Sequence, residues 1–486
     1  MKTSPVLLLL CVWAAHAHAS ALGAQSLERS SAFLRLGIAR SSGAPLKLRV
    51  EAFSQRHSLR LQPAAAPFAK TFKLQITSRD EQGRVIIKDI AHDKDDDATD
   101  LYEDPEAGSV VRLNAAGIEG FISPSLALNT AADGRYEAVR QNYVAEPAHH
   151  TSDYLEVPKE ARNQYQSTAT GRVATSATVE MYIVVDSTLT AKLGSNTNVK
   201  NYLGVFWNAV NLRFATMTDP KINLVLAGAL IVRDSSDETY INDNILTQNY
   251  INGDNTLTSL SKWAFNQRDS LPSHDMVYLM TGKDMASVEN GSIQKNLAGI
   301  AWLSAACVVV PSQKLSYNTA MGEDSALYTG VMTAAHEVAH NLGAPHDGSG
   351  SATSCSWDQG YIMSYVQGNP NKLFFSPCSK SLMKEYISRN GAACLHTDTA
   401  TSQITLSSTL PGEKVSLDQQ CQAATKESGA YASMSVTEDS LCVQLVCQWK
   451  KQEGMYIYTY TQSTGRPAAE GSLCKSGGKC KDGSCQ

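Results

Sequence analysis

Three histidines and a glutamate between residues 336 and 347 have the spacing of a metal-dependent hydrolase. The string HEVAHNLGAPHD runs from His336 to Asp347. On a helix, His336 and His340 lie one turn apart on the same face, so both imidazoles can reach one ion. Gly343 permits the left-handed turn that ends the helix and brings His346 round as a third ligand. Three protein ligands leave one position of a tetrahedral Zn²⁺ open for water, as in catalytic rather than structural zinc sites.

Glu337 follows the first histidine, and we expect it to act as the general base. It is placed to take a proton from the zinc-bound water while the zinc polarises a peptide carbonyl, and then to pass the proton to the leaving amine. An isolated H-E-x-x-H string can arise by chance, but a glycine and a third histidine at fixed offsets make it far more specific. The sequence therefore predicts zinc-dependent hydrolysis of peptide bonds.

A helix must carry this string, and we expect it to begin at Asp324 or Ser325 and to end at Gly343. Strand-like and helical patterns alternate ahead of it, which indicates an α/β domain with a mixed sheet. The strands are expected at 179–185, 222–232, 276–280 and 299–303, and the helices at 203–214 and 256–265. Alternating runs at 46–53, 72–76 and 85–90 predict a separate β-rich region in the first part of the chain.

Composition indicates an extracellular protein. Residues 1–19 combine Lys2, a short apolar core and a small-residue cleavage site, which is typical of a secretory signal peptide. Ten of the 11 cysteines lie at or beyond Cys307, and this fits a chain whose later half is stapled by disulfides. The net charge of −5 gives no basic footprint for nucleic acid, and no later stretch is apolar enough to span a membrane. We expect a secreted monomer.

The composition also suggests where the chain divides. After the signal peptide we expect a β-rich prodomain at 20–177 that ends in a polar linker, and a catalytic domain at 178–398. A spacer and a small cysteine-rich domain would occupy 399–486. The exposed, small-residue composition of the linker predicts maturation by cleavage between Asn163 and Ala177. Asn290, in the sequence Asn-Gly-Ser, is a candidate glycosylation acceptor.

With Tyr361-Ile362-Met363-Ser364-Tyr365 downstream of the zinc string, the chain resembles the metzincins, in which a methionine lies in a tight turn beneath the zinc ligands. Met363 matches that methionine. Asp347 directly follows the third histidine. In this it resembles the adamalysin or reprolysin branch, which carries an aspartate at that position. The segments VEMYIVVD (179–186), SHDMVYLMT (273–281) and FSPCS (375–379) agree with that branch. The short chain and its cysteine-rich tail are most similar to the salivary metalloproteases of blood-feeding ticks.

The resemblance implies a five-stranded sheet with the active-site helix below it and a smaller C-terminal subdomain. It also implies the disulfides Cys307–Cys394 and Cys355–Cys378, with the six tail cysteines paired among themselves. Glu180 and Asp275 match positions that hold a structural calcium in some reprolysins, although Thr397 stands where an asparagine is expected.

Tyr365 resembles a zinc-binding tyrosine of other metzincins, but we favour a packing role for it. The prodomain lacks the free cysteine that caps the zinc in many relatives. It must therefore block the cleft by its bulk or lend a carboxylate or a histidine to the zinc.

The expected substrates are extracellular proteins, by family resemblance host matrix or clotting proteins such as fibrinogen. The alternative is an adhesive or decoy protein whose cysteine-rich tail binds a receptor on an inactive protease scaffold. The intact set of Glu337 and three histidines favours the enzyme.

Overall fold

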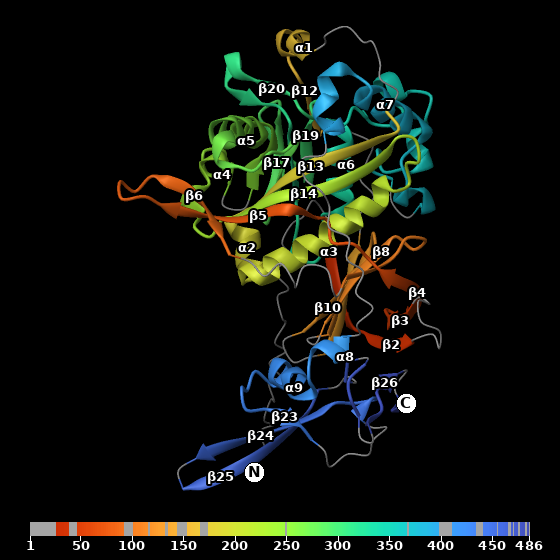
Figure 1. Ribbon diagram of the computed structural model, residues 1–486. Coiled ribbons are helices and arrows are strands. Elements are labelled where there is room, and N and C mark those ends of the chain that lie inside the picture. Colours follow the sequence, from red (N-terminus) through yellow and green to blue (C-terminus); the bar gives the residue numbers. More distant parts are fainter. Residues whose placement is uncertain are drawn as a thin grey trace, which may run out of the picture.

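Two large sheets and a small disulfide-rich tail make up the computed structural model (Figure 1). It describes residues 26–37, 46–91, 101–114, 117–131, 135–142, 153–165, 174–247, 250–366, 369–397, 411–433, 441–453, 455–464, 468–469, 471–474, 477–481 and 484–485. The predicted signal peptide lies outside these residues, and so do residues 166–173 of the predicted cleavage segment.

The central sheet has eight strands in the order β12-β19-β22-β16-β13-β14-β5-β6. Their bounds are Tyr154–Glu156 (β12), Gly299–Leu303 (β19), Thr319–Glu323 (β22), Met276–Thr281 (β16), Ser176–Val185 (β13), Lys221–Ile231 (β14), Phe68–Arg79 (β5) and Val85–Ile90 (β6). β14, β13, β16 and β22 run parallel, and β19 is antiparallel to β22. The sheet is mixed, as predicted.

Helices cover both faces of this sheet, which explains why β13, β14 and β16 are apolar along almost their whole length. Residues of α3 and α6 share one core with alternate residues of β13, and residues of α5 share a second core with the others. The helices are Lys159–Tyr165 (α1), Ser187–Leu193 (α2), Asn196–Phe214 (α3), Thr239–Asn242 (α4), Gly253–Gln267 (α5), Val331–Asn341 (α6), Pro377–Ile387 (α7), Pro411–Lys414 (α8) and Leu417–Thr425 (α9).

The helix that carries the zinc string is shorter than predicted. It begins at Val331 rather than at Asp324 or Ser325. Asp324 instead accepts hydrogen bonds from the backbone N–H groups of Ala326 and Gly330, and so holds a loop ahead of the helix. Ala326 and Tyr328 have positive φ in this loop, and a positive φ is incompatible with a right-handed α-helix. α6 ends at Asn341, two residues before the predicted stop.

The N-terminal β region forms a nine-stranded sheet with its own core. Its strands are Ser26–Ser31 (β1), Phe33–Gly37 (β2), Leu46–Ala52 (β3), Gln55–Pro63 (β4), Leu101–Asp104 (β7), Ser109–Asn114 (β8), Gly117–Ser123 (β9), Leu126–Thr130 (β10) and Tyr136–Asn142 (β11). However, β5 and β6 leave this region to extend one edge of the central sheet, and β12 extends the other. The N-terminal part is therefore not the separate unit that we expected.

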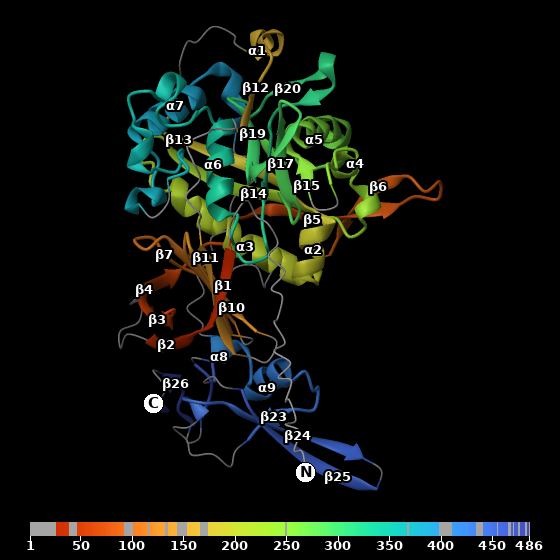
Figure 2. The same cartoon turned by 180° about the vertical axis from the view of Figure 1, so that it is seen from behind.

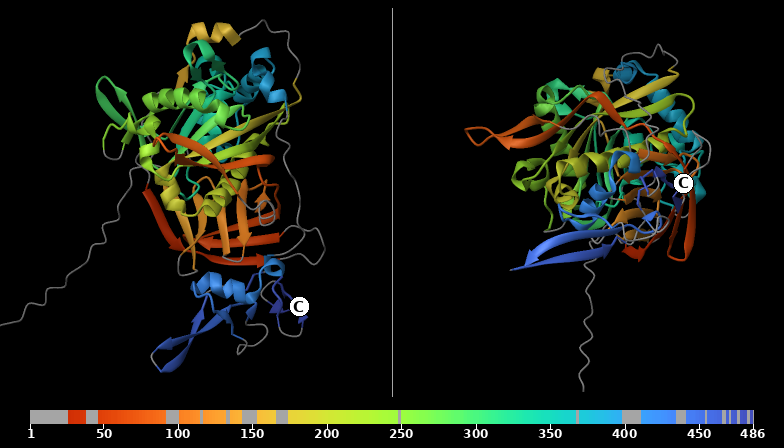
Figure 3. Two further views of the ribbon diagram at one scale, coloured as in Figure 1. Left: turned by 60° about the vertical axis from the view of Figure 1, so that its left-hand side comes forward. Right: turned by 60° about the horizontal axis from the view of Figure 1, so that its bottom comes forward.

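The cysteine-rich tail lies on the far side of the nine-stranded sheet from the central sheet (Figures 2 and 3). It contains α8, α9 and a β-hairpin of Val446–Glu453 (β24) and Tyr456–Ser463 (β25). Disulfides join Cys421 to Cys447, Cys442 to Cys480 and Cys474 to Cys485. Short strands complete the chain at Tyr250–Asn252 (β15), Asp284–Glu289 (β17), Ser292–Leu297 (β18), Val309–Val310 (β20), Leu315–Ser316 (β21), Tyr431–Ala432 (β23), Cys480–Lys481 (β26) and Ser484–Cys485 (β27). Asn290 is exposed in the turn between β17 and β18.

Among the described residues, no helix combines the length and the hydropathy needed to cross a membrane.

Candidate metal centre and active site

The three histidines of the zinc string converge on one point. His336 and His340 lie one turn apart on α6, and Gly343, with a φ of 102°, turns the chain so that His346 returns toward them. The Nε2 atoms of His336 and His346 are 3.2 Å apart. Two nitrogen ligands of a tetrahedral Zn²⁺ are separated by about 3.3 Å when each Zn–N bond is about 2.05 Å. All three rings are buried.

Backbone carbonyls fix the orientation of two of the rings. His336 Nδ1 lies 2.8 Å from the oxygen of Ile362, and His340 Nδ1 lies 2.7 Å from the oxygen of Ala344. A carbonyl oxygen can only accept, so each Nδ1 carries the proton and each Nε2 presents a lone pair to the centre. Burial, with the charge of His336 adding to it, lowers the pKa of His340 to about 3 and keeps that ring neutral.

A carboxylate from the N-terminal region completes the centre. Asp153 Oδ1 lies 2.7 Å from His346 Nε2 and 3.1 Å from His340 Nε2, and Oδ2 lies 3.2 Å from His336 Nε2. Carboxylate oxygens and imidazole lone pairs are all acceptors, so a shared proton or a metal cation must lie between them. Three nitrogen donors and one oxygen donor around one point are the number and kind of ligands that Zn²⁺ takes. The residues present therefore fit a zinc ion.

Glu337 lies beside this centre in a space that a glycine leaves open. Its Oε2 is buried and has no hydrogen-bond partner among the described residues. A Cβ on Gly299 would stand 2.5 Å from Glu337 Oε1, so the carboxylate occupies the place of the missing side chain. Burial, with the charge of Asp153 adding to it, raises the pKa of Glu337 well above its ordinary value. A carboxyl group with a raised pKa is suited to take up and return a proton.

The predicted methionine turn lies directly under the histidines. Met363 is fully buried, and Ser364 N–H donates to the Tyr361 oxygen to close the turn. Two carbonyl oxygens of the turn accept hydrogen bonds from the zinc string: Ile362 O from His336 Nδ1, and Met363 O from the Asp347 N–H. The turn thus supports the first ligand and the backbone that follows the third.

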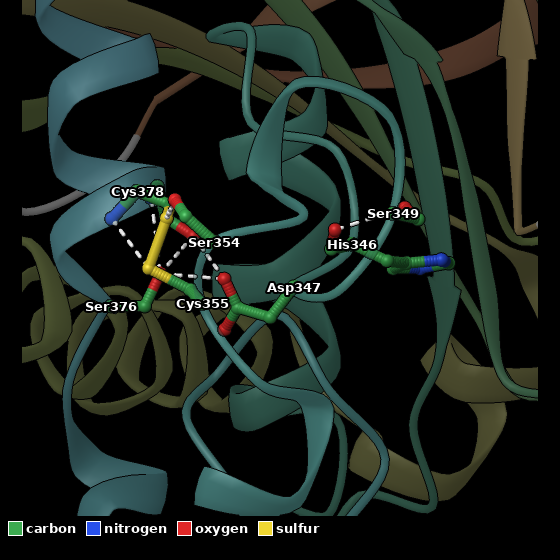
Figure 4. Close-up of a disulfide and its surroundings, with 8 residues drawn as sticks. His346, Asp347, Ser349, Ser354, Cys355, Ser376 and Cys378 are labelled. Carbon is green, nitrogen blue, oxygen red and sulfur yellow. Dashed lines mark hydrogen bonds between the residues drawn. A yellow bond between two sulfur atoms is a disulfide. The ribbon is translucent and has the colours of Figure 1, made fainter.

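Asp347 does not face the centre. Its Oδ1 accepts from the hydroxyls of Ser376, the N-cap of α7, and Ser379. Figure 4 shows the Asp347 carboxylate turned toward Ser376 and the Cys355–Cys378 disulfide, and the His346 ring turned away. Asp347 therefore anchors the next helix to the zinc string.

Tyr365 reaches the centre. Its hydroxyl donates to Asp153 Oδ2 at 2.5 Å and lies 3.3 Å from His346 Nε2. Its ring also packs against those of His336, His346 and Trp357, with centroids 5.8, 5.3 and 5.0 Å apart, so Tyr365 combines packing contacts with a contact at the predicted ligands.

Glu180 and Asp275 lie together, Glu180 on β13 and Asp275 directly before β16. The Glu180 N–H donates to Asp275 Oδ2, and both side chains are buried. Burial, with the charge of Glu180 adding to it, raises the pKa of Asp275 to about 7. Asp275 also lies beside the Cys307–Cys394 disulfide.

Sequence reasoning missed two residues of the site. Asp153 lies more than 180 positions before the zinc string, and nothing in its local sequence distinguishes it from other acidic residues. The absence of a prodomain cysteine was the one signal that some other group must reach the metal. Gly299 is the first residue of β19, and the sequence alone does not show that a larger side chain there would clash with Glu337.

Comparisons with known proteins identify the families that two parts of the chain match. Residues 175–376 match the reprolysin-type metallo-peptidase family M12, and residues 411–486 match the ADAMTS cysteine-rich domain 2. One similar protein, from Bombyx mori, is named "A disintegrin and metalloproteinase with thrombospondin motifs like", and it is 33% identical over 302 residues. That match covers 60% of this chain and 42% of the Bombyx protein.

Two venom metalloproteinases of the scorpion Tityus serrulatus are also similar. An antarease-like one is 32% identical over 231 residues, which cover 45% of this chain and 95% of the venom protein. An antarease is 28% identical over 318 residues, which cover 61% of this chain and 79% of that protein. These relatives come from an insect and a scorpion, so the likeness to tick salivary proteins stays a prediction. The chain belongs to family M12 of the metallopeptidases and is a metalloendopeptidase of the reprolysin type.

Proposed function

We propose that this protein is a secreted, zinc-dependent endopeptidase that is made as an inactive precursor. The observation that carries the proposal is the convergence of three histidine Nε2 atoms beside the buried carboxyl group of Glu337. Zn²⁺ bound there would polarise a peptide carbonyl and acidify a coordinated water.

The chain's own residues supply the proton transfers. Glu337 takes a proton at its unpartnered Oε2 and later gives it to the leaving amine, which its raised pKa favours. His336 and His340 keep their Nδ1 protons on backbone carbonyls, so their Nε2 atoms stay available to the metal throughout. The turn around Met363 holds this arrangement rigid from below.

We assign the N-terminal β region, 20–177, as a prodomain that maturation removes, 178–398 as the catalytic domain and 399–486 as spacer and cysteine-rich domain. Five disulfides in the described chain support an oxidising, extracellular setting. The substrates that we propose are extracellular proteins, of which gelatin and fibrinogen are the first to try.

Two finer roles are proposed on the same basis. Glu180 and Asp275 are adjacent buried carboxylates, and bound Ca²⁺ would relieve their mutual repulsion. The cysteine-rich tail would capture substrates for the catalytic domain. A purely adhesive protein would not need Glu337 and the three histidines in this arrangement.

The test is zymography of the secreted chain, after removal of the N-terminal region, on gelatin and fibrinogen. We expect lysis that a chelator abolishes and that added Zn²⁺ restores. Absence of chelator-sensitive lysis in a mature chain that binds one zinc would refute the proposal.

A further inference from the structure

We infer that Asp153 is the group that keeps the precursor inactive, by filling the fourth coordination position of the metal with its carboxylate. This inference rests on the proposed function, because it assumes that a metal occupies the histidine centre.

The contacts of Asp153 are those of a metal ligand. Its side chain is buried, and within the described chain the basic side chains within 4 Å of its carboxylate are those of the three histidines, with no lysine or arginine among them. It approaches all three rings at Nε2, the atom that the metal would bind. A carboxylate that merely orients a ligand would bind Nδ1, but the Nδ1 atoms of His336 and His340 are already bonded to carbonyls.

The strand that follows Asp153 holds the carboxylate in place. β12 pairs with β19 at the edge of the central sheet, and the Ala301 N–H donates to the Asp153 oxygen at 3.2 Å. The Tyr154 ring packs on those of His340 and His346, with centroids 4.8 and 5.4 Å apart. A sheet edge is where extended peptides add to a protein, so β12 also occupies the place that a substrate strand would take.

The residues after β12 fix the segment more firmly. Val157 and Ala161 are fully buried in the same core as Trp302 and Val308 of the catalytic part. Tyr365 donates its hydroxyl to Asp153 Oδ2 from the opposite side. Asp153 is thus bound through the strand, the core and a direct hydrogen bond, which suits a group that must compete with water for the metal.

The experiment replaces the zinc of the intact precursor with Co²⁺, whose visible and ultraviolet spectra report its ligands. Three precursors are compared with the wild type: Asp153→Asn, Asp153→Cys and the control Glu156→Cys. Glu156 lies three residues later, at the end of β12, but its carboxylate is exposed and paired with Arg162. Each precursor is also titrated with acetohydroxamate, a small metal chelator.

We expect Asp153→Cys to give an intense thiolate-to-cobalt charge-transfer band, because cysteine is itself a strong ligand of such metals. Glu156→Cys should give none. Asp153→Asn should bind acetohydroxamate at least about tenfold more tightly than the wild-type precursor, because in the wild type the chelator must displace the carboxylate and can bind only in the fraction of molecules whose fourth position is open. If Asp153→Asn is not recovered folded, the spectrum of Asp153→Cys decides.

No charge-transfer band in Asp153→Cys, or equal acetohydroxamate affinity in Asp153→Asn and the wild type, would overturn the inference and leave the bulk of β12 as the cause of latency. The mature enzyme is assayed in parallel. Its failure to cleave peptides would count against the proposed function alone, because the cobalt spectra of the precursors do not depend on turnover.

Discussion

Replacing Gly299 by alanine should disable the enzyme without touching a ligand or the general base. The new Cβ would stand 2.5 Å from Glu337 Oε1, 2.6 Å from Thr333 Cγ2 and 2.8 Å from Glu337 Cγ. Ordinary contacts begin near 3.4 Å. The Glu337 carboxylate or the β19 backbone must therefore move by roughly 1 Å, the distance by which the shortest contact falls short.

The cost follows from that displacement. A misplacement of about 1 Å at a reacting group can lower the rate about 100-fold, which is a loss of about 2.7 kcal/mol of transition-state stabilisation. Overpacking of a buried site should also cost about 1–3 kcal/mol of stability. The three histidines come from α6 and the loop after it, so the zinc content should not change.

The assay is kcat/KM of the mature enzyme on a fluorogenic peptide, with zinc per chain and the melting temperature measured on the same samples. Gly429→Ala is the matched control, because a Cβ there meets nothing within 4 Å. A Gly299→Ala enzyme within twofold of wild-type kcat/KM would refute the role of this glycine in placing Glu337.

Glu337→Gln should lower turnover by at least about 100-fold while one zinc per chain is retained, as measured by mass spectrometry and peptide hydrolysis; full activity would exclude Glu337 as the base. Burial, with the charge of Asp186 adding to it, raises the pKa of Glu238 from 4.5 to about 7. The stability that its protonated form contributes is therefore present below about pH 4.5 and is lost as the pH rises through 7. Glu238→Gln can keep both hydrogen bonds to Ser187, so at pH 8 its free energy of unfolding should exceed that of the wild type by at most about 3 kcal/mol. Its melting temperature at pH 8 should therefore be higher, and an equal or lower melting temperature would contradict this. Finally, one cut within 166–173 should leave the N-terminal region bound on gel filtration and the enzyme inactive; immediate release would contradict the shared sheet described above.

The zinc string could be predicted because its chemistry is local. His336 and His340 are brought together by helix geometry alone, and Gly343 is needed where the chain turns. The strands of the catalytic part were predictable for the same reason, since continuous apolar runs such as β13 and β14 report burial on both faces.

What the sequence did not show depends on contacts between distant segments. The predicted start of α6 is wrong because Asp324 does not cap the helix: its carboxylate accepts hydrogen bonds from the loop ahead of α6 and from the Tyr202 hydroxyl of α3. Asp153 was not predicted because its role is defined by β19, about 150 residues later, with which its strand pairs. The same holds for β5, because a strand-like pattern does not show which of the two large sheets the strand joins.

The N-terminal region therefore does two things at once. Through β12 and Asp153 it occupies the edge of the sheet and the metal centre, and through β5 it pairs with β14 at the opposite edge. Phe68, Phe72 and Leu74 of β5 belong to the same apolar core as α3 and α6. An inhibitory segment that relied on Asp153 alone could exchange readily with water or substrate, but this one is part of the sheet that positions the active-site helix. Activation must therefore dismantle a shared core as well as withdraw a ligand, and the release of the N-terminal region, rather than the first cut, should set the rate at which activity appears.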